Sequence, residues 1–564
     1  MLQDMLVAEV VVRILEEEGI EAAFGIPGAA INPIYKYLAR SKIIKHYTAR
    51  HEEGAVHAAD GYYRASGKLA VAICTSGPAA TNFVTGLYTA QIDSVPLVAI
   101  TGNASTDQFG KEAFQCVPIA EIAKPVVKAS YCITEPEDMV SILQTAFRVS
   151  KEGRPGPVLI DLPLDVQLAE IEYDPVSYKP LTWEKPKPDS KKIDLALDMI
   201  MDAREPVIIM GGGVILADAC DELREFVEYM SLPVVTTYMA KGGLPAGHPL
   251  HVGHVGIQVG QPYANSFFLN TDVVLGIGCR FTDRHTGDLS VYRGKRKFVH
   301  IDIEPTQIGR VFPSDLGIVS DAKLAINALL KRSQERGLRR GPTLETMGIP
   351  KKRSRLTRKT DYDDYPIKPP RVYQELNRVF DDNTLFYTGC GLAQIWSGQL
   401  QEVDMPRRYL PSGGAGTLGY ELPAAIGGKV GCPNRTSVAV VGDGGFMFMA
   451  QELAMAAQYD LPIIVVIVNN GYLSLIRQNQ KYAYGCEYGV KLWYDDSGHN
   501  MTDFVELAEA IGCKGERVER AGEIQGALQR AIESKRPYVV DIIVERETDC
   551  SMGANIAEVR EFLD

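Results

Sequence analysis

Residues Val438-Ala-Val-Val-Gly-Asp-Gly-Gly-Phe446 combine a short apolar run with a glycine-rich end. Such a run is typical of a strand buried on both faces of a parallel sheet. Ligands of open parallel sheets bind at the carboxyl ends of the strands, where Gly442-Asp443-Gly444 is expected to lie. Glycine lets the backbone approach a phosphate closely, and the carboxylate of Asp443 is a hard oxygen ligand suited to Mg²⁺. The pattern therefore predicts a phosphate and metal site at the edge of a parallel sheet.

A second strand and loop follow at a spacing that supports this interpretation. Pro462–Val468 is apolar and leads into Asn469-Asn470-Gly471-Tyr472. The 27 residues from Asp443 to Asn470 leave room for one helix and one parallel strand, so the two strand ends should lie side by side. The side-chain oxygen of Asn470 and the backbone carbonyl of Tyr472 could then bind the same ion. Either loop alone is usually a turn, and only the pair at this spacing favours a metal site.

Similar apolar runs alternate with helical patterns through most of the 564-residue chain. This alternation predicts the fold class α/β, with three doubly wound parallel-sheet domains. A Pro- and Lys-rich stretch, Tyr173–Lys192, and a polar stretch, Arg332–Pro370, interrupt the alternation and are expected to be linkers. The expected domains are residues 1–170, 190–335 and 370–564. The other expected strands are Leu69–Thr75, Leu97–Thr101, Val158–Asp161, Val207–Met210 and Val273–Ile277.

Composition and charge argue against several classes of partner. The net charge of −12 disfavours nucleic acid and anionic membranes. The basic run Lys351–Lys359 could be a nucleic-acid patch, or it could be a solvated linker or helix face. The negative net charge of the whole chain favours the solvated linker or helix face. The apolar runs are too short to span a bilayer, and the N-terminus carries Asp4 where a signal peptide carries basic residues. Ten scattered cysteines without a Cys-x-x-Cys pair fit free thiols, so a soluble cytoplasmic protein is expected.

Two motifs near the N-terminus are candidates for the same site. Phe24-Gly-Ile-Pro-Gly28 follows an apolar run, and Arg50-His-Glu-Glu-Gly54 opens a helix that is expected to continue to about Ser66. Taken alone, Glu52 and Glu53 are both first-turn acids of the kind that the helix dipole favours. A partner motif is needed to assign either of them a chemical role.

Together these motifs resemble the signature of thiamine-diphosphate-dependent enzymes, and the likeness covers essentially the whole chain. Glu52 matches the glutamate that activates the cofactor through a pyrimidine ring nitrogen, whereas Glu53 remains a capping acid. In Gly413-Gly-Ala-Gly-Thr-Leu-Gly-Tyr-Glu-Leu-Pro423, Leu418 matches the apolar wedge that bends the cofactor, and Gly416 the carbonyl that meets its exocyclic amine. The resemblance implies that Asp443, Asn470 and the carbonyl of Tyr472 hold Mg²⁺. The other residues implied in binding thiamine diphosphate are Pro27, Gly28, Gly444 and Gly445.

The expected middle domain carries the features of a dinucleotide site. Met210-Gly-Gly-Gly-Val214 follows an apolar run, although a lone glycine cluster is a weak signal. Arginines suit a pyrophosphate, and a strand-end acid suits a ribose or adenine. These segments resemble the FAD-binding middle domain of the acetohydroxyacid synthase group, some relatives of which bind ADP-like ligands there or nothing. The resemblance implies FAD in a non-redox role, bound by Gly211, Gly212, Gly213, Arg280, Arg284, Asp302 and Asp321.

Within that group the chain is most similar to the glyoxylate carboligases, also called tartronate-semialdehyde synthases. The segments that carry the likeness are Phe24–Pro33, His300–Arg310, Asp315–Lys323, Asn470–Gln478 and Ser551–Gly553. They imply that two glyoxylate molecules condense to tartronate semialdehyde and CO2. Glyoxylate carboligases have valine where this chain has Glu52. The chain is therefore either a relative or variant of these carboligases that has the ordinary glutamate, or an acetolactate synthase-like carboligase that uses pyruvate. A further alternative is an FAD-dependent oxidoreductase similar to pyruvate oxidase, with FAD as its redox partner.

Four more residues are expected to face the substrate, a small 2-oxo acid. Phe114 and Gln115 match a Phe-Gln pair that lines the family's active site. Asn479 stands where relatives that prefer 2-oxobutyrate have tryptophan, and its polar side chain suits a small hydrophilic acceptor. Arg477 could meet a carboxylate or could belong to a solvated helix face. Family members place the cofactor between two chains, which implies a homodimer or homotetramer with active sites at the subunit interface.

Overall fold

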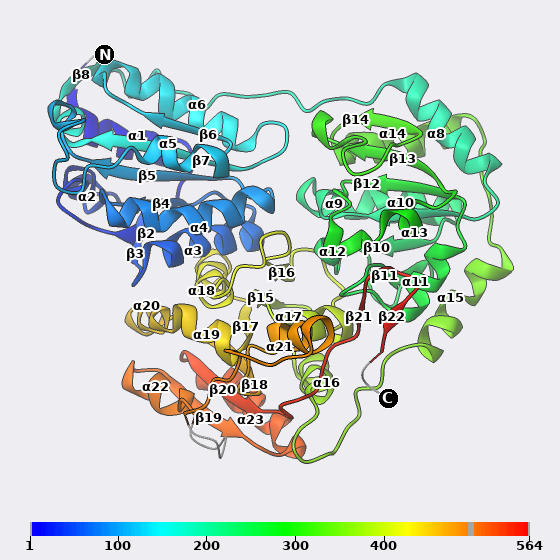
Figure 1. Cartoon of the computed structure of the whole chain (residues 1–564). Coiled ribbons are helices and arrows are strands. Elements are labelled where there is room, and N and C mark those ends of the chain that lie inside the picture. Colours follow the sequence, from blue (N-terminus) through cyan, green and yellow to red (C-terminus); the bar gives the residue numbers. More distant parts are fainter. Residues whose placement is uncertain (1–2, 495–500, 562–564) are drawn as a thin grey trace.

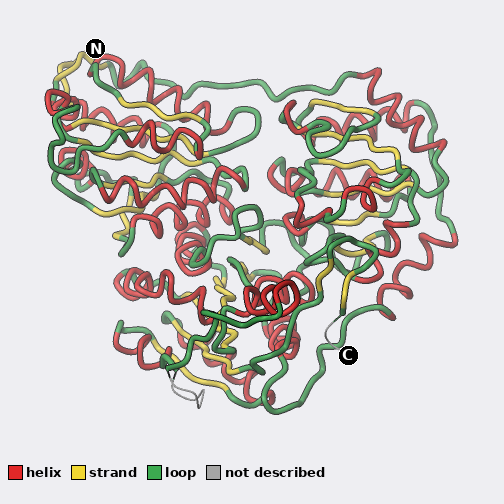
Figure 2. Tube along the Cα trace, viewed as in Figure 1, coloured by secondary structure: helices red, strands yellow, loops and turns green. Residues whose placement is uncertain are grey.

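A computed structural model describes residues 3–494 and 501–561 as three parallel six-stranded sheets with helices packed around them (Figure 1). Figure 2 shows the same alternation of strands and helices in each of the three regions. The expected α/β fold class is confirmed. Apolar runs form the central strands because both faces of each sheet are covered and water is excluded from them.

The N-terminal sheet has the strand order β3-β2-β4-β5-β7-β6. Its strands are β2 (Ala22–Ile26), β3 (Lys45–Thr48), β4 (Val71–Cys74), β5 (Leu97–Asn103), β6 (Ala129–Cys132) and β7 (Pro157–Pro163). Its helices are α1 (Val7–Glu17), α2 (Asn32–Leu38), α3 (Glu52–Ser66), α4 (Pro78–Ile92), α5 (Ile119–Ala123), α6 (Met139–Lys151) and α7 (Leu164–Leu168). A small antiparallel pair, β1 (Gln3–Leu6) and β8 (Glu170–Tyr173), closes this part of the chain. The predicted end of the helix that begins at Glu52 is confirmed.

The C-terminal sheet repeats the topology of the N-terminal sheet, with the order β16-β15-β17-β18-β20-β19. Its strands are β15 (Thr384–Thr388), β16 (Tyr409–Pro411), β17 (Thr436–Gly442), β18 (Ile463–Asn469), β19 (Lys514–Val518) and β20 (Tyr538–Ile543). Its helices are α16 (Pro369–Val379), α17 (Leu392–Leu400), α18 (Glu421–Gly431), α19 (Asp443–Met449), α20 (Leu453–Gln458), α21 (Ser474–Asn479), α22 (Phe504–Ala510) and α23 (Ile524–Ser534). In both sheets the chain reverses its direction of growth between the first and third strands, where open sheets bind ligands.

The middle sheet has the order β11-β10-β9-β12-β13-β14. This is the arrangement of dinucleotide-binding folds, in which the ligand crosses the sheet edge between the first and fourth strands. The strands are β9 (Pro206–Met210), β10 (Val234–Thr236), β11 (His251–His254), β12 (Val273–Ile277), β13 (Lys297–Asp302) and β14 (Leu316–Val319). The helices are α8 (Ser190–Asp202), α9 (Gly212–Leu216), α10 (Cys220–Met230), α11 (Pro262–Leu269), α12 (Asp283–Thr286), α13 (Leu289–Arg293) and α14 (Ala322–Glu335).

Helices α3 and α18 join the N-terminal and C-terminal sheets, and they lie one above the other in Figure 1. A Cβ atom on Gly61 would lie 2.1 Å from the carbonyl oxygen of Ala424, and one on Gly427 would lie 1.8 Å from that of Ala58. Only glycine fits at these two positions, so the helix backbones can approach closely. One hydrophobic core runs continuously through both sheets at this contact.

The polar stretch that was expected to be a linker contains a helix, α15 (Leu344–Arg355). Thr343 and Thr346 form a capping box at its start, and Ile349 is buried against the middle domain. The basic run begins near the end of α15, and Arg358, which follows the helix, pairs with Glu561. The chain ends beside the middle domain in a short pair, β21 (Met552–Gly553) and β22 (Val559–Arg560).

Two global features bear on the class of protein. No helix within residues 3–494 and 501–561 is both long and apolar enough to cross a membrane. All ten cysteines are free thiols, four of which are buried.

Candidate active site

Asp443 stands at the junction between β17 and α19, and its side chain is buried. Burial raises the pKa of its carboxyl group to about 7, while backbone N–H groups of Asp443, Asn470 and Gly444 face it and oppose that shift. Strands β17 and β18 pair in parallel up to their ends. The two loops that the sequence singled out are therefore neighbours at one edge of the sheet.

The side chain of Asn470 and the backbone of Tyr472 converge on the hydroxyl group of Ser474. The Ser474 oxygen lies 2.7 Å from Asn470 Oδ1 and 3.1 Å from the carbonyl oxygen of Tyr472. The two proposed ligand oxygens therefore lie within hydrogen-bonding distance of the same hydroxyl group. No group of three or more His, Cys, Asp or Glu side chains in the described ranges offers another metal site. One carboxylate, one amide and one carbonyl suit Mg²⁺, whose other ligands are usually waters and phosphate oxygens.

Gly444 and Gly445 leave the backbone bare in front of Asp443. A Cβ atom on Gly444 would lie 2.8 Å from Leu473 Cδ2, so a side chain there would collide with the loop after β18. A Cβ atom on Gly445 would lie 3.8 Å from Leu418 Cδ2. The bare backbone and the oxygen donors together fit a diphosphate with its metal ion.

The loop between β16 and α18 holds the residues expected to bend the cofactor. Gly416 and Gly419 have positive φ angles of 63° and 84°, a conformation that a β-carbon disfavours. These turns leave the side chain of Leu418 half-buried and close to Gly445. Leu418 thus lies beside the bare backbone, where an apolar wedge was predicted.

Asp93 anchors this loop to the N-terminal domain. Its carboxylate accepts the backbone N–H groups of Gly413 and Gly414 at 3.0 and 2.8 Å. It also pairs with Arg64 at 3.1 Å, and Arg64 pairs with Asp60. No sequence motif marks Asp93, which acquires its role only when two domains meet.

The N-terminal half of the site separates the two candidate glutamates. Glu52 is the first residue of α3 and accepts the side-chain amide N–H of Asn82 at 2.8 Å. Glu53 lies 3.3 Å from His57 on the next turn of its own helix. Glu53 therefore has a partner within the helix, whereas Glu52 points away toward α4.

The other N-terminal candidates surround the carboxyl ends of β2 and β4. Pro27 and Gly28 follow β2, and a Cβ atom on Gly28 would lie 2.5 Å from the side chain of Thr75 after β4. Gln115 has a positive φ of 55° and packs over Gly77 at the start of α4. Phe114 is 88% exposed. The structure thus places these residues at one edge of the sheet, but it leaves the aromatic side chain of Phe114 exposed.

No hydrogen bond or ion pair within the described part of the chain joins Glu52 to Asp443, Asn470 or Tyr472. Next to Glu52 the two halves are joined by Glu452, which accepts the backbone N–H groups of Arg50 and His51. The N-terminal and C-terminal groups of the site are therefore separate half-sites in a single chain.

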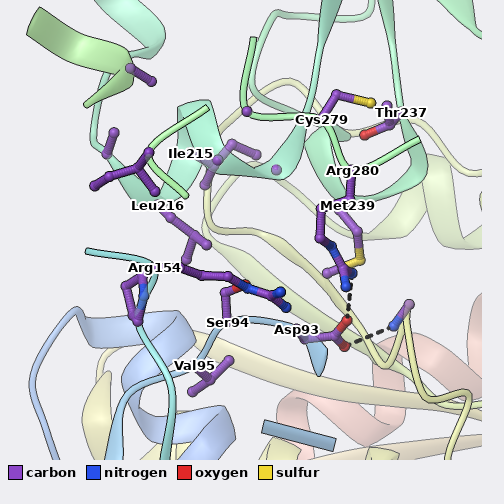
Figure 3. A pocket seen from close by; sticks show the side chains of 18 of the residues that line it. Asp93, Ser94, Val95, Arg154, Ile215, Leu216, Thr237, Met239, Cys279 and Arg280 are labelled. Atoms are coloured by element: carbon purple, nitrogen blue, oxygen red, sulfur yellow. Dashed lines mark hydrogen bonds and ion pairs between the residues drawn. The ribbon is translucent and has the colours of Figure 1, made fainter. Parts of the chain in front are cut away.

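A cavity of about 420 Å³ lies at the carboxyl ends of β9 and β12 and is lined by all three domains (Figure 3). Gly211 lies behind it, where a Cβ atom would meet the carbonyl oxygen of Gly278 at 2.0 Å. Asp321 caps α14 and pairs with Lys185, while burial raises the pKa of Asp302 to about 6. Six of the seven residues predicted for FAD line the cavity, namely Gly212, Gly213, Arg280, Arg284, Asp302 and Asp321.

Two arginines of the cavity contact the loop between β16 and α18, which is the predicted cofactor-bending loop. Arg280 points at Asp93 across the cavity, with 3.7 Å between the charged groups (Figure 3). Arg284 donates to the carbonyl oxygen of Gly413 at 3.3 Å and to Gln394 at 2.9 Å. The cavity and the loop therefore share these side chains.

Arg154 is a further cation of the cavity that the sequence did not reveal. It donates to Ser94 at 2.8 Å and to the carbonyl oxygens of Gln91 and Ile92. Burial lowers its pKa to about 10. It forms no ion pair with a carboxylate among the described residues. Since its neighbours in sequence are Pro and Gly, no spacing pattern marks it as a binding residue.

The two residues expected to face the substrate from α21 have different surroundings. The guanidinium of Arg477 is buried and lies 3.1 Å from Asp549 and 3.2 Å from Glu487. Asn479 is exposed at the end of the helix. Contact of either residue with a substrate stays a prediction, and Arg477 would have to exchange a carboxylate partner to make it.

Three family models match the chain in the order of its sheets. They are the N-terminal TPP binding domain, the central domain and the C-terminal TPP binding domain of thiamine pyrophosphate enzymes, over residues 5–122, 193–329 and 389–542. The chain belongs to the thiamine pyrophosphate enzymes. It is a thiamine-diphosphate-dependent carboligase of the acetohydroxyacid synthase group, as the motifs predicted.

Relatives of two kinds resemble nearly the whole chain. A glyoxylate carboligase of Escherichia coli O157:H7 is 45% identical, with 99% of this chain and 96% of that protein covered. An acetolactate synthase large subunit of Corynebacterium glutamicum is 40% identical, with 99% and 90% covered. A probable acetolactate synthase large subunit of Methanococcus aeolicus is 39% identical, with 99% and 95% covered.

Proposed function

We propose that this carboligase condenses two glyoxylate molecules to tartronate semialdehyde and CO2. The observation that carries the choice of glyoxylate is the 45% identity to a glyoxylate carboligase over nearly the whole chain. The polar, exposed Asn479 ends α21, the helix that follows the Asn470–Tyr472 loop, and it supports a small hydrophilic acceptor. The domain boundaries that we propose are 1–170, 190–335 and 370–564.

Thiamine diphosphate, when bound, supplies the carbanion chemistry of decarboxylation and carbon–carbon bond formation. Asp443, Asn470 and the carbonyl of Tyr472 would hold its Mg²⁺, and the bare backbone at Gly444 and Gly445 would admit its diphosphate. Leu418 would keep its two rings in a bent arrangement.

Glu52 is the proton-transfer group in this proposal. Its carboxyl group would hold the proton at the pyrimidine nitrogen of the bound cofactor, and the amide of Asn82, which donates to it, would fix its orientation. Gln115, on its strained backbone, orients the acceptor. The two half-sites must also close over the substrate to exclude bulk water.

A second copy of the chain would complete each site. Phe114 on the N-terminal half-site is 88% exposed, and Met447 and Phe448 on α19 are 49% and 55% exposed. We therefore propose a homodimer or homotetramer in which Glu52 of one subunit serves the half-site of Asp443 in its partner.

FAD is the ligand that we propose for the middle cavity. The arrangement of the middle sheet, the glycines after β9 and the three arginines Arg154, Arg280 and Arg284 suit a dinucleotide with its diphosphate. A cavity of about 420 Å³ lies within the usual range for such ligands. The redox chemistry of a flavin is not used in the proposed reaction.

Product identification tests the proposal. The purified chain, supplied with thiamine diphosphate, Mg²⁺ and isotopically labelled glyoxylate, should release one CO2 for each tartronate semialdehyde. Formation of acetolactate from pyruvate, without carboligation of glyoxylate, would support the acetolactate synthase alternative, which Glu52 favours. Bleaching of bound flavin by pyruvate would support the oxidoreductase alternative.

A further inference from the structure

Glu421 is a buried glutamate that the proposed function leaves without a role. It is the first residue of α18, directly after the cofactor-bending loop, and only 1% of it is exposed. Neither of its carboxyl oxygens has a hydrogen-bond partner of good geometry, and within the described residues no other carboxyl group has both oxygens fully buried and without such a partner. It forms no ion pair in the described ranges.

The surroundings of Glu421 are backbone N–H groups of two loops. The N–H group of Glu421 itself, those of Gly389 and Cys390 between β15 and α17, and that of Gly419 in the bending loop face the carboxyl group and lower its pKa. Burial has the larger effect and raises the pKa to about 7. Burying a carboxyl group without a cation nearby costs free energy of folding. The position of Glu421 between two loops therefore suggests a functional reason for keeping it.

The carboxyl group of Glu421 fills the space that a side chain at position 389 would take. A Cβ atom on Gly389 would lie 2.1 Å from Glu421 Oε1, which is too close for any residue except glycine. A Cβ atom on Gly445 would lie 3.7 Å from the same oxygen and 3.8 Å from Leu418 Cδ2. The carboxyl group therefore lies next to the predicted wedge and behind the diphosphate loop.

We propose that Glu421 is a positioning residue whose carboxyl group ties the loop at Gly389–Cys390 to the bending loop at Gly419, and so holds Leu418 where thiamine diphosphate must bend. Glu421 acts through the backbone and not on the substrate. The inference rests on the proposed role of Leu418 and is independent of which 2-oxo acid the enzyme uses.

The test compares cofactor binding in Glu421→Gln with binding in a matched control. Glutamine has the size of glutamate but turns an N–H₂ group toward backbone donors, so the affinity for thiamine diphosphate should fall by about tenfold or more. The control, Glu375→Gln, changes another glutamate of the C-terminal domain that is 1% exposed and pairs with Arg371. Calorimetric titration of the cofactor-free full chain with thiamine diphosphate in the presence of Mg²⁺ gives the affinities. Near-ultraviolet circular dichroism of the bound cofactor reports its bending.

A compensating exchange separates positioning from simple loss of packing. In Gly389→Asp/Glu421→Gly the acid enters the same space from the other loop, so affinity and the dichroism band should return to within about threefold of the wild type. Equal losses in Glu421→Gln and Glu375→Gln, or unchanged binding in Glu421→Gln, would overturn the proposal. Failure of the double variant to recover affinity that Glu421→Gln has lost would overturn it too. Binding is measured without substrate, so a wrong assignment of glyoxylate leaves the result intact.

Discussion

The carboxylate of Glu452 accepts the backbone N–H of His51 at 2.8 Å. It accepts that of Arg50 at 3.0 Å as well, so one side chain of the C-terminal domain holds the two residues that precede Glu52. Glu452 follows α19, the helix that begins at Asp443. The segment from Asp443 to Glu452 therefore connects the proposed metal ligand to the backbone that carries the proposed activating glutamate, Glu52. In the proposed dimer these two ends belong to different active sites.

Glu452→Gln should change how stability depends on pH. Burial raises the pKa of Glu452 from 4.5 to about 7, so between these values the folded chain holds a proton that the unfolded chain has lost. Stability is therefore lost as pH rises from about 4.5 through 7, with a slope of at most about 1.4 kcal/mol per pH unit. The variant should lack this decline. Denaturant midpoints at several pH values in this window measure the decline, with Glu375→Gln as the control. Parallel plots of midpoint against pH for the wild type and Glu452→Gln would contradict the assignment.

Glu52→Gln should nearly abolish proton transfer at the cofactor. A positioned general acid–base group contributes about 10²- to 10⁴-fold, so cofactor C–H exchange and turnover should fall by that amount. Glu53→Gln is the matched control, because it changes the adjacent first-turn acid and leaves Asn82 bound to Glu52. Exchange of the bound cofactor into deuterated water gives the rates. Equal effects of the two substitutions would remove Glu52 from its role.

Asp443→Ala should abolish Mg²⁺-dependent retention of thiamine diphosphate. The change removes the carboxylate ligand of the proposed set, and loss of an outer-shell partner alone typically costs about 10- to 100-fold in metal affinity. Gel filtration followed by cofactor analysis, with and without Mg²⁺, measures retention. Glu506→Ala, on an exposed position of the same domain, serves as the control. Retention equal to that of the control would exclude Asp443 as a ligand.

Arg280→Met should lower the flavin content of the purified chain. The guanidinium lines the cavity and faces Asp93, and loss of a charged hydrogen-bonding group costs about tenfold in affinity. Arg293→Met is the control, because Arg293 lies outside the cavity and pairs with Asp315. Flavin absorbance relative to protein after titration with FAD measures occupancy. A flavin-free wild type under saturating FAD would refute the proposed ligand.

Local patterns were enough to predict the parts of the fold that local physics controls. The strand Val273–Ile277 has the predicted bounds, and α3 ends at Ser66, because Gly67 stops the helix in a left-handed conformation. The adjacency of the Asp443 and Asn470 loops followed from strand spacing. These features depend on apolar periodicity, turns and caps.

The remaining parts depend on contacts between distant segments. Asp93 and Glu421 are ordinary acids in sequence, and each acquires its role only when a loop of another element presents backbone N–H groups to it. Helix α15 was not predicted, because it lies in a polar stretch and its features are a capping box and one buried isoleucine. A short helix docked on another domain leaves little periodicity to detect.

The measurement that bears most directly on the proposed function is the ratio of kcat/KM for glyoxylate to kcat/KM for pyruvate. Both would be determined by CO2 release from the full chain with thiamine diphosphate, Mg²⁺ and FAD. The ratio should exceed one, and tartronate semialdehyde should be the product from glyoxylate. A ratio below one, with acetolactate as the product from pyruvate, would contradict the assignment.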